Sequence, residues 1–154
     1  MLGRVLVLAG VLVVAGCGDE RDTVARVVHR VADAAELKNI DGVMAFVAPD
    51  YRDPMGRDRA RIRELMAAEL RREERISIVF RRLEVGEIRD DRVTATLKGV
   101  LAEGDVKGAS ISEVLPRSMG AWRFTLELRR DDGRWLITRG EEQSIPPATF
   151  LLGG

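Results

Sequence analysis

The sequence has one cysteine, Cys17, and one histidine, His29, among its 154 residues. A disulfide within the chain needs two cysteines, and a structural zinc ion needs four ligands that are mostly cysteine or histidine. The composition therefore excludes a disulfide framework and a conventional zinc site. We expect neither a metal ion nor another cofactor.

An excess of positive charge is also missing. Lys and Arg together number 25, and Asp and Glu together number 25. A domain that binds nucleic acid normally shows a strong basic excess. We therefore expect no nucleic-acid partner.

Long apolar runs are absent as well. The run that opens the chain covers only residues 5–14, whereas a membrane-spanning helix needs about 20 apolar residues. Arg4 precedes this run and the small residues Ala15 and Gly16 follow it, which is the three-part layout of a secretory signal peptide. We interpret residues 1–16 as a signal peptide.

The end of this leader, Val14-Ala15-Gly16-Cys17, resembles the lipobox of bacterial lipoproteins: an aliphatic residue, two small residues and a cysteine. The resemblance implies that Cys17 becomes the first residue of the mature protein and carries diacylglycerol on its sulfur and an acyl chain on its amino group. Two or more chains hold a protein stably on a membrane, whereas one holds it only marginally. The alternatives are an ordinary cleaved leader with a chance cysteine, or a small cysteine in the core.

The lipobox resemblance also implies a lipid-anchored location in the bacterial cell envelope. Gly18 follows the cysteine, at the place where an aspartate favours the inner membrane in enteric bacteria. For a Gram-negative source this favours the periplasmic face of the outer membrane. Residues 17–21 are then a short polar tether between the lipid and a folded domain.

Three helices are predicted in the first half of that domain. Asp22 or Thr23 can cap the first, Asn39 can cap a shorter second one that ends before Pro49, and Asp58 can cap the third. Apolar residues recur at helical spacing in the first and third helices. They are Val24, Val27, Val28, Val31 and Ala35 in the first, and Ile62, Leu65, Met66 and Leu70 in the third.

From about residue 75 the apolar residues alternate, which predicts strands. Leu83 and Val85 fall out of phase with the alternation before them, which indicates a β-bulge. Alternation recurs over 93–98 and 122–129, and tight turns are predicted at Asp90-Asp91 and Asp132-Gly133. We predict a loop with a short structured piece over 104–120, and a flexible tail over 143–154.

Helices followed by an antiparallel meander predict an α+β domain over residues 22–142, with three N-terminal helices packed on a curved, four-stranded antiparallel sheet. The order of elements, the Asp53-Pro54-Met55-Gly56 turn and the closing hairpin over 122–139 resemble the nuclear transport factor 2-like superfamily, of the cystatin-like α+β type. The resemblance implies a cone in which helices and sheet enclose a pocket. Its members include ketosteroid isomerases and dehydratases as well as non-catalytic proteins.

Asp53 is a weak candidate for a catalytic residue. Ketosteroid isomerases carry their catalytic base, an aspartate, in a similar turn at the pocket mouth, and apolar surroundings raise the pKa of a carboxyl group there. Those enzymes also place a tyrosine on the first helix as an oxyanion donor, and the first predicted helix of this sequence has no tyrosine. A base without such a donor achieves little. The alternative is that Asp53 caps or braces the turn beside Pro54.

Tyr51 and Trp122 are the other candidates for lining a ligand pocket. Each has a structural alternative, because Tyr51 can pack beneath the sheet, and Trp122 and Trp135 occupy alternating strand positions typical of core residues. His29 is predicted on the flank of the first helix or in solvent. The arginines at positions 57, 59, 61 and 63 are predicted to lie on a solvated surface, with contact to anionic headgroups as the alternative.

These observations favour a non-catalytic, lipid-anchored envelope lipoprotein whose cone-shaped domain binds a partner protein or a small apolar ligand. One alternative is a pocket enzyme, of the isomerase, dehydratase or hydrolase type, with Asp53 as general base. The other is an accessory subunit of an envelope complex.

Cells grown with a tagged fatty acid are expected to attach the tag to this polypeptide, because Cys17 would be acylated. Labelling followed by purification and mass spectrometry measures the modification. Mature protein that carries no tag, or that still begins with Met1, would contradict the lipobox interpretation.

Overall fold

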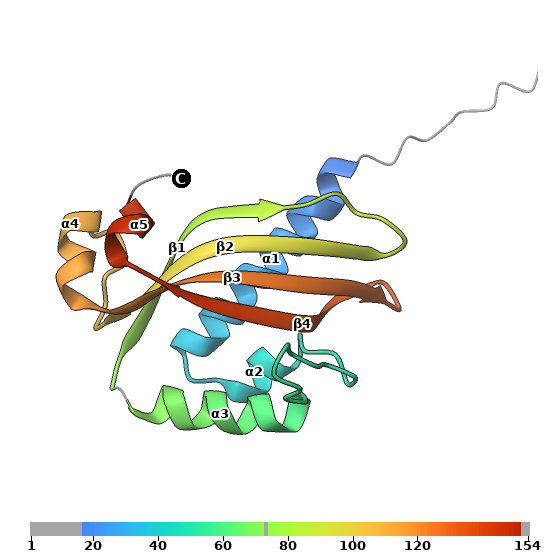
Figure 1. The fold of residues 1–154 in the computed structure, drawn as a ribbon, viewed down its shortest axis with the longest axis horizontal. Helices are drawn as coiled ribbons and strands as arrows, with labels where there is room; N and C mark the ends of the chain where they lie inside the picture. The colour runs from blue at the N-terminus through green and yellow to red at the C-terminus, as the bar shows by residue number, and fades with distance from the viewer. Residues whose placement is uncertain (1–16, 73, 152–154) are drawn as a thin grey trace, which may run out of the picture.

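The structure is a computed structural model, and it describes residues 17–72 and 74–151. Its elements follow one another as predicted, helices first and a meander of strands afterwards (Figure 1). They are α1 (Cys17–Glu36), α2 (Ile40–Met44), α3 (Arg59–Arg72), β1 (Ile76–Val85), β2 (Arg92–Glu103), α4 (Ile111–Val114), the 3₁₀ turn η1 (Leu115–Arg117), β3 (Ser118–Asp131), β4 (Arg134–Ile145) and α5 (Pro147–Leu151).

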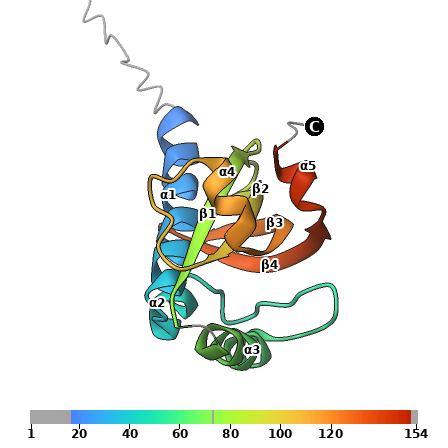
Figure 2. The same cartoon turned by 90° about the vertical axis from the view of Figure 1, so that its left-hand side faces the viewer.

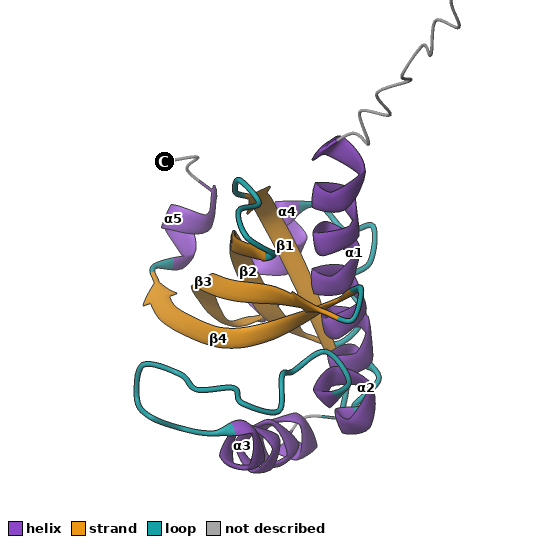
Figure 3. Cartoon of the chain, turned by 90° about the vertical axis from the view of Figure 1, so that its right-hand side faces the viewer, coloured by secondary structure: helices purple, strands orange, loops and turns teal. Residues whose placement is uncertain are grey.

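The four strands form one antiparallel sheet in the order β1-β2-β3-β4, which confirms the predicted α+β architecture. Helix α1 crosses one face of this sheet, and α5 lies on the opposite side (Figures 2 and 3). We call the face that packs on α1 the inner face and the other the outer face. Helix α3 lies beyond the sheet at the end nearest α2 (Figure 1).

The main core lies between α1 and the inner face. Val24, Val27 and Val28 of the predicted stripe are buried there against strand residues such as Leu97 and Leu128. Burying one such side chain contributes about 1.5–3 kcal/mol, so this contact positions α1 on the sheet. Periodicity of 3.6 in the helix and of 2 in the strands presents the two apolar surfaces to each other.

Both predicted caps of the later helices are present. The side chain of Asn39 accepts a hydrogen bond from the Gly42 amide (2.9 Å), and that of Asp58 accepts one from the Arg61 amide (2.9 Å). Helix α3 nevertheless has no buried residue, and of its apolar stripe only Ile62 packs against the main core. The stripe of α3 is therefore left half-exposed.

The predicted bulge in β1 lies between Arg81 and Glu84, where the pairing with β2 changes register. Arg82 stands within it at φ 52°, in the left-handed region that an arginine rarely adopts. The two predicted tight turns also have positive φ, with Asp90 at 49°, Asp91 at 58°, Asp132 at 49° and Gly133 at 76°. This conformation matches the right-handed twist of the strands that the turns join.

The outer face carries a second, smaller core that the sequence did not indicate. Val100 and Ala121 from the strands are buried against Val106, Val114 and Phe150. The predicted loop over 104–120 thus contains α4 and η1, which bring Val114 onto the sheet.

The prediction of a flexible tail over 143–154 is wrong through Leu151. Strand β4 continues to Ile145, α5 follows it, and Phe150 is only 2% exposed. Pro146 and Pro147 do not prevent this, because proline is tolerated in the first turn of a helix. The apolar side chain of Phe150 draws the segment onto the outer face.

The predicted tether over 17–21 is also helical, since α1 begins at Cys17. Glu20 forms an ion pair with Arg130 of β3 and so joins the first turns of α1 to the sheet. The predicted leader, residues 1–16, lies outside the described residues. Among the described helices, none has the length and apolar character needed to cross a membrane.

Replacing Phe150 by alanine is expected to lower the free energy of unfolding by about 3 kcal/mol, because the ring is buried in the second core. Urea unfolding followed by circular dichroism measures the change. Leu37→Ala is the matched control, since Leu37 is 79% exposed and its loss should change stability by less than about 0.5 kcal/mol. Equal stability of the two variants would contradict a docked α5.

Candidate functional site

Two of the predicted site residues, Tyr51 and Asp53, lie in the segment that joins α2 to α3, which runs beside the edge strand β4. The Ala48 amide donates to the Ile137 carbonyl (2.9 Å), the Ile137 amide donates to Phe46 (2.7 Å), and the Arg52 amide donates to Thr138 (3.1 Å). The segment therefore extends the hydrogen-bonded ladder of the sheet and holds Tyr51 and Asp53 against it.

Asp53 is buried, with 3% of its surface exposed, and its carboxylate is occupied by its own turn. One oxygen accepts hydrogen bonds from the amides of Met55 and Arg57, both 2.9 Å long. The other accepts from the guanidinium of Arg57. This arrangement corresponds to the bracing role that was the alternative to catalysis.

The electrostatics of Asp53 point the same way. Burial acts to raise the pKa of the carboxyl group, but the hydrogen bonds and charge of Arg57 outweigh burial and lower it. A carboxylate with a lowered pKa is a weaker base, and both of its oxygens already accept hydrogen bonds. The side chain of Asp53 is also fully buried, so neither oxygen is exposed to a substrate.

Tyr51 belongs to the main core, where it is 6% exposed. Its hydroxyl lies beside Gly140 of β4, so close that a Cβ at that glycine would stand 3.1 Å from it. Burial raises the pKa of the Tyr51 hydroxyl, and the charge of Asp53 raises it further. Tyr51 therefore packs beneath the sheet and stays protonated at neutral pH.

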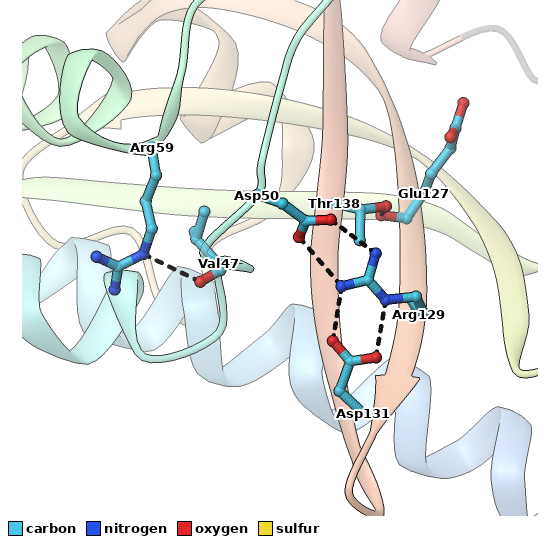
Figure 4. Close-up of polar contacts among 7 residues, drawn as sticks. All are labelled: Val47, Asp50, Arg59, Glu127, Arg129, Asp131 and Thr138. Carbon is cyan, nitrogen blue, oxygen red and sulfur yellow. Dashed lines mark hydrogen bonds and ion pairs between the residues drawn. The ribbon is translucent and has the colours of Figure 1, made fainter.

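A cluster of three charged residues beside this segment was not anticipated (Figure 4). The guanidinium of Arg129 donates to both oxygens of Asp50 (3.0 and 3.1 Å) and to both oxygens of Asp131 (2.7 Å each). Hydrogen bonds from Arg129 lower the pKa of Asp50 and of Asp131, and these same bonds raise the pKa of Arg129. The cluster fastens the segment to the end of the β3–β4 hairpin.

Arg129 and Asp131 are two residues apart, which places both on one face of β3. This spacing is the only feature of the sequence that could have indicated the cluster. Asp50 lies 79 residues from Arg129 along the chain, and no local pattern joins them.

The arginines at positions 57, 59, 61 and 63 had all been predicted to lie on a solvated surface, and this prediction is wrong for two of them. Arg57 binds Asp53. Arg59 donates to the carbonyl of Val47 (3.2 Å; Figure 4). It also donates to the carbonyl of Met44 (2.9 Å) and so satisfies the carboxyl end of α2. Arg61 and Arg63 are exposed, as expected. Arg57 and Arg59 make these tertiary contacts because both come directly after the turn at Asp53.

Trp122 differs from the second tryptophan. Trp135 is 4% exposed and belongs to the main core, which confirms its structural role. Trp122 is half-buried and belongs to neither core. Its ring lies against Gly120, where a Cβ would come within 2.4 Å of it.

The neighbours of Trp122 across the strands are small. Gly99 of β2 and Ser144 of β4 are its register partners on the inner face. The Cβ position of Gly99 lies 3.5 Å from the Phe124 ring and 3.7 Å from the Phe80 ring. Trp122 therefore has a small residue as register partner on each neighbouring strand.

His29 is exposed on α1, as predicted, and its ring meets that of Phe80 edge-on at a centroid distance of 5.6 Å.

Two hollows on the described surface have volumes of about 120 and 430 Å³. Both lie on the outer face, and neither is lined by Tyr51, Asp53 or Trp122. Within residues 17–72 and 74–151 no group of three His, Cys, Asp or Glu side chains could hold a metal ion.

Comparison with solved structures identifies the fold. A nuclear transport factor 2-like protein of unknown function from Pseudomonas putida superimposes with a TM-score of 0.66 at 16% identity, covering 82% of this chain and 87% of that one. A protein of unknown function with a cystatin-like fold from Nostoc punctiforme gives 0.66 at 12% identity, covering 85% and 94%. A protein described as a candidate scytalone dehydratase from Novosphingobium aromaticivorans gives 0.68 at 10% identity, covering 83% and 85%.

This chain therefore has the nuclear transport factor 2-like, cystatin-like fold that the order of its elements had indicated. At such identities the likeness concerns the fold alone. No family model matches the sequence, and no curated protein matches it.

Asp53→Asn is expected to lower the free energy of unfolding by about 1–3 kcal/mol at pH 7, because the amide cannot pair with the Arg57 guanidinium. The pKa of Asp53 is lowered on folding, so its contribution is complete above the unfolded value of about 3.9 and is lost as pH falls through the folded value. The difference between variant and wild type should therefore narrow below about pH 4.

Urea unfolding at several pH values between about 7 and 3 measures this difference. Glu142→Gln, at an exposed position of β4, serves as the control and should leave stability unchanged. A difference that is constant over the whole pH range would contradict the ionic role of Asp53.

Proposed function

We propose that this chain is a lipid-anchored lipoprotein of the bacterial envelope whose domain binds apolar groups on its inner face without catalysing a reaction. The half-exposed ring of Trp122, outside both cores, is the observation that carries the binding part of this proposal. The lipobox at Cys17 carries the location, with the periplasmic face of the outer membrane favoured in a Gram-negative cell.

The inner face is suited to binding because side chains of other elements cover one part of it and leave another part partly exposed. Around Leu97 and Leu128 the residues of α1 cover it completely. Around Trp122 the strands contribute Gly99 and Gly120, and Ile78 and Leu101 are only half-buried. An apolar molecule that covered these side chains would gain about 25 cal/mol for each Å² removed from water.

Helix α3 adds apolar surface that is not used by the cores. Leu65, Met66 and Leu70 are half-exposed and belong to neither core. Methionine adapts its shape readily, which favours contact with varied apolar partners. The occupant we propose is a small apolar molecule, or an apolar side chain that a partner protein presents.

An enzyme that uses Asp53 as general base gains no support from the geometry. The carboxylate is buried, accepts three hydrogen bonds from its own turn and has a lowered pKa. The names of structural neighbours do not alter this conclusion, because a shared fold carries many different functions.

The anchor would lie close to the folded body. Because α1 begins at Cys17, the described chain contains no extended linker between that residue and the sheet. A lipid on Cys17 would then hold the domain beside the membrane with limited freedom.

Trp122→Ala is expected to weaken binding of the neutral fluorescent probe N-phenyl-1-naphthylamine at least fivefold, a loss of roughly 1 kcal/mol of apolar contact. A fluorescence titration of the purified protein in a non-micellar buffer measures the affinity. Leu37→Ala, which removes an exposed apolar side chain elsewhere, should leave the affinity unchanged.

The free energy of unfolding of the variants distinguishes a binding role of Trp122 from a structural role. Trp122→Ala should cost much less than Trp135→Ala, for which about 3 kcal/mol or more is expected because that ring is buried. A photo-crosslinking amino acid at position 122 tests for a protein partner in cells. Equal probe affinity in wild type and Trp122→Ala, together with no protein captured from position 122, would contradict binding at this face.

A further inference from the structure

The β1 bulge holds a strained arginine on a strand. Among the described residues outside glycine, positive φ occurs at Lys38, Arg82, Asp90, Asp91 and Asp132, and of these only Arg82 lies within a strand. A left-handed conformation is unfavourable for an arginine, whereas glycine adopts it freely. Bulges redirect side chains, and such strain is concentrated at functional sites.

The bulge adjoins a row of basic residues across the outer face. Arg81 of β1 is the register partner of Lys98 of β2, and Lys98 is the register partner of Arg123 of β3. Like charges at directly opposite positions of a sheet repel each other. The row therefore gathers positive charge on this part of the outer face.

Two residues of this row, Lys98 and Arg123, line the smaller hollow, of about 120 Å³. Its full lining is Arg82, Glu84, Thr96, Leu97, Lys98 and Arg123. Lys98 is 7% exposed as a whole residue. The lining brings together three cations, one hydroxyl and a single carboxylate. In the part of the chain that the structure describes, Arg82 and Arg123 form no ion pair.

We propose that this hollow binds a phosphate group, either as the free anion or at the end of a small phosphate monoester. Guanidinium and ammonium groups are the side chains that recognise phosphate, and their hydrogen bonds to it are charge-assisted. The hollow is small, at about 120 Å³, which suits one tetrahedral anion, whereas sites for drug-sized ligands begin at about 300 Å³.

The five polar residues of the lining have different roles in this site. Arg82 reaches the hollow because the bulge turns it out of the regular alternation, and Arg123 enters from β3. Lys98 supplies a positive charge from the sheet between them, and Thr96 supplies a hydroxyl donor. Glu84 limits the net charge of the lining to two positive units. This site lies on the outer face and does not depend on the proposed function of the inner face.

Isothermal titration calorimetry of the full chain, purified in a non-ionic detergent, tests the site with inorganic phosphate at constant ionic strength. Wild type is expected to bind phosphate saturably at one site. Arg82→Gly and Arg123→Gln should each weaken binding at least about tenfold, because each removes a charge-assisted hydrogen bond. Arg30→Gln on the exposed surface of α1 removes the same charge elsewhere and should bind as wild type does.

Arg82→Gly also separates binding from folding. Glycine relieves the positive φ, so urea unfolding should show a stability equal to or above that of wild type while phosphate binding is lost. A second titration with glycerol 3-phosphate distinguishes the two sources, since tighter binding than inorganic phosphate would identify a monoester. Absence of saturable phosphate binding by wild type, or wild-type affinity in both Arg82→Gly and Arg123→Gln, would overturn the proposal.

Discussion

The packing of α1 against the inner face of the sheet is the contact on which the rest of the structure depends. It buries Val24, Val27 and Val28 against the strands and forms the main core. The sheet alone would expose a wide apolar face, and α1 alone would be a marginal helix in water, because most helical stability in proteins comes from tertiary packing. Once α1 is docked, α2 and the segment after it are brought to the edge of β4.

In that segment the charged residues stabilise the fold, although Asp53 had been a candidate for a general base. Asp53 is held by Arg57, Asp50 by Arg129, and the carboxyl end of α2 by Arg59. These groups satisfy one another or the backbone, and so the charges near the turn are stabilised in their ionised forms. A general base needs the opposite condition, a carboxylate whose oxygen is available and whose pKa lies near the operating pH.

The two faces of the sheet end up with different properties. The inner face leaves Trp122 half-exposed beside small residues, which favours apolar contact. The outer face is divided between the second core under α5 and a basic row beside the β1 bulge. Strand alternation produces this separation, because residues at odd and even positions of β2 and β3 point to opposite faces. A single sheet can therefore present two chemically distinct surfaces at once.

The sequence by itself determined the local elements: the stripe of α1, the caps at Asn39 and Asp58, the β1 bulge, the turns and the order of helices and strands that indicates the fold. These features depend on neighbours within a few residues, so periodicity and capping chemistry reveal them. Only the tertiary structure decided that Asp53 braces its own turn through Arg57, that Arg129 joins Asp50, that Phe150 closes a second core, and that Arg82, Lys98 and Arg123 share one hollow. Apart from the pair within the turn, these contacts join residues far apart in the chain, and strand register and burial select the partners, which no local pattern encodes.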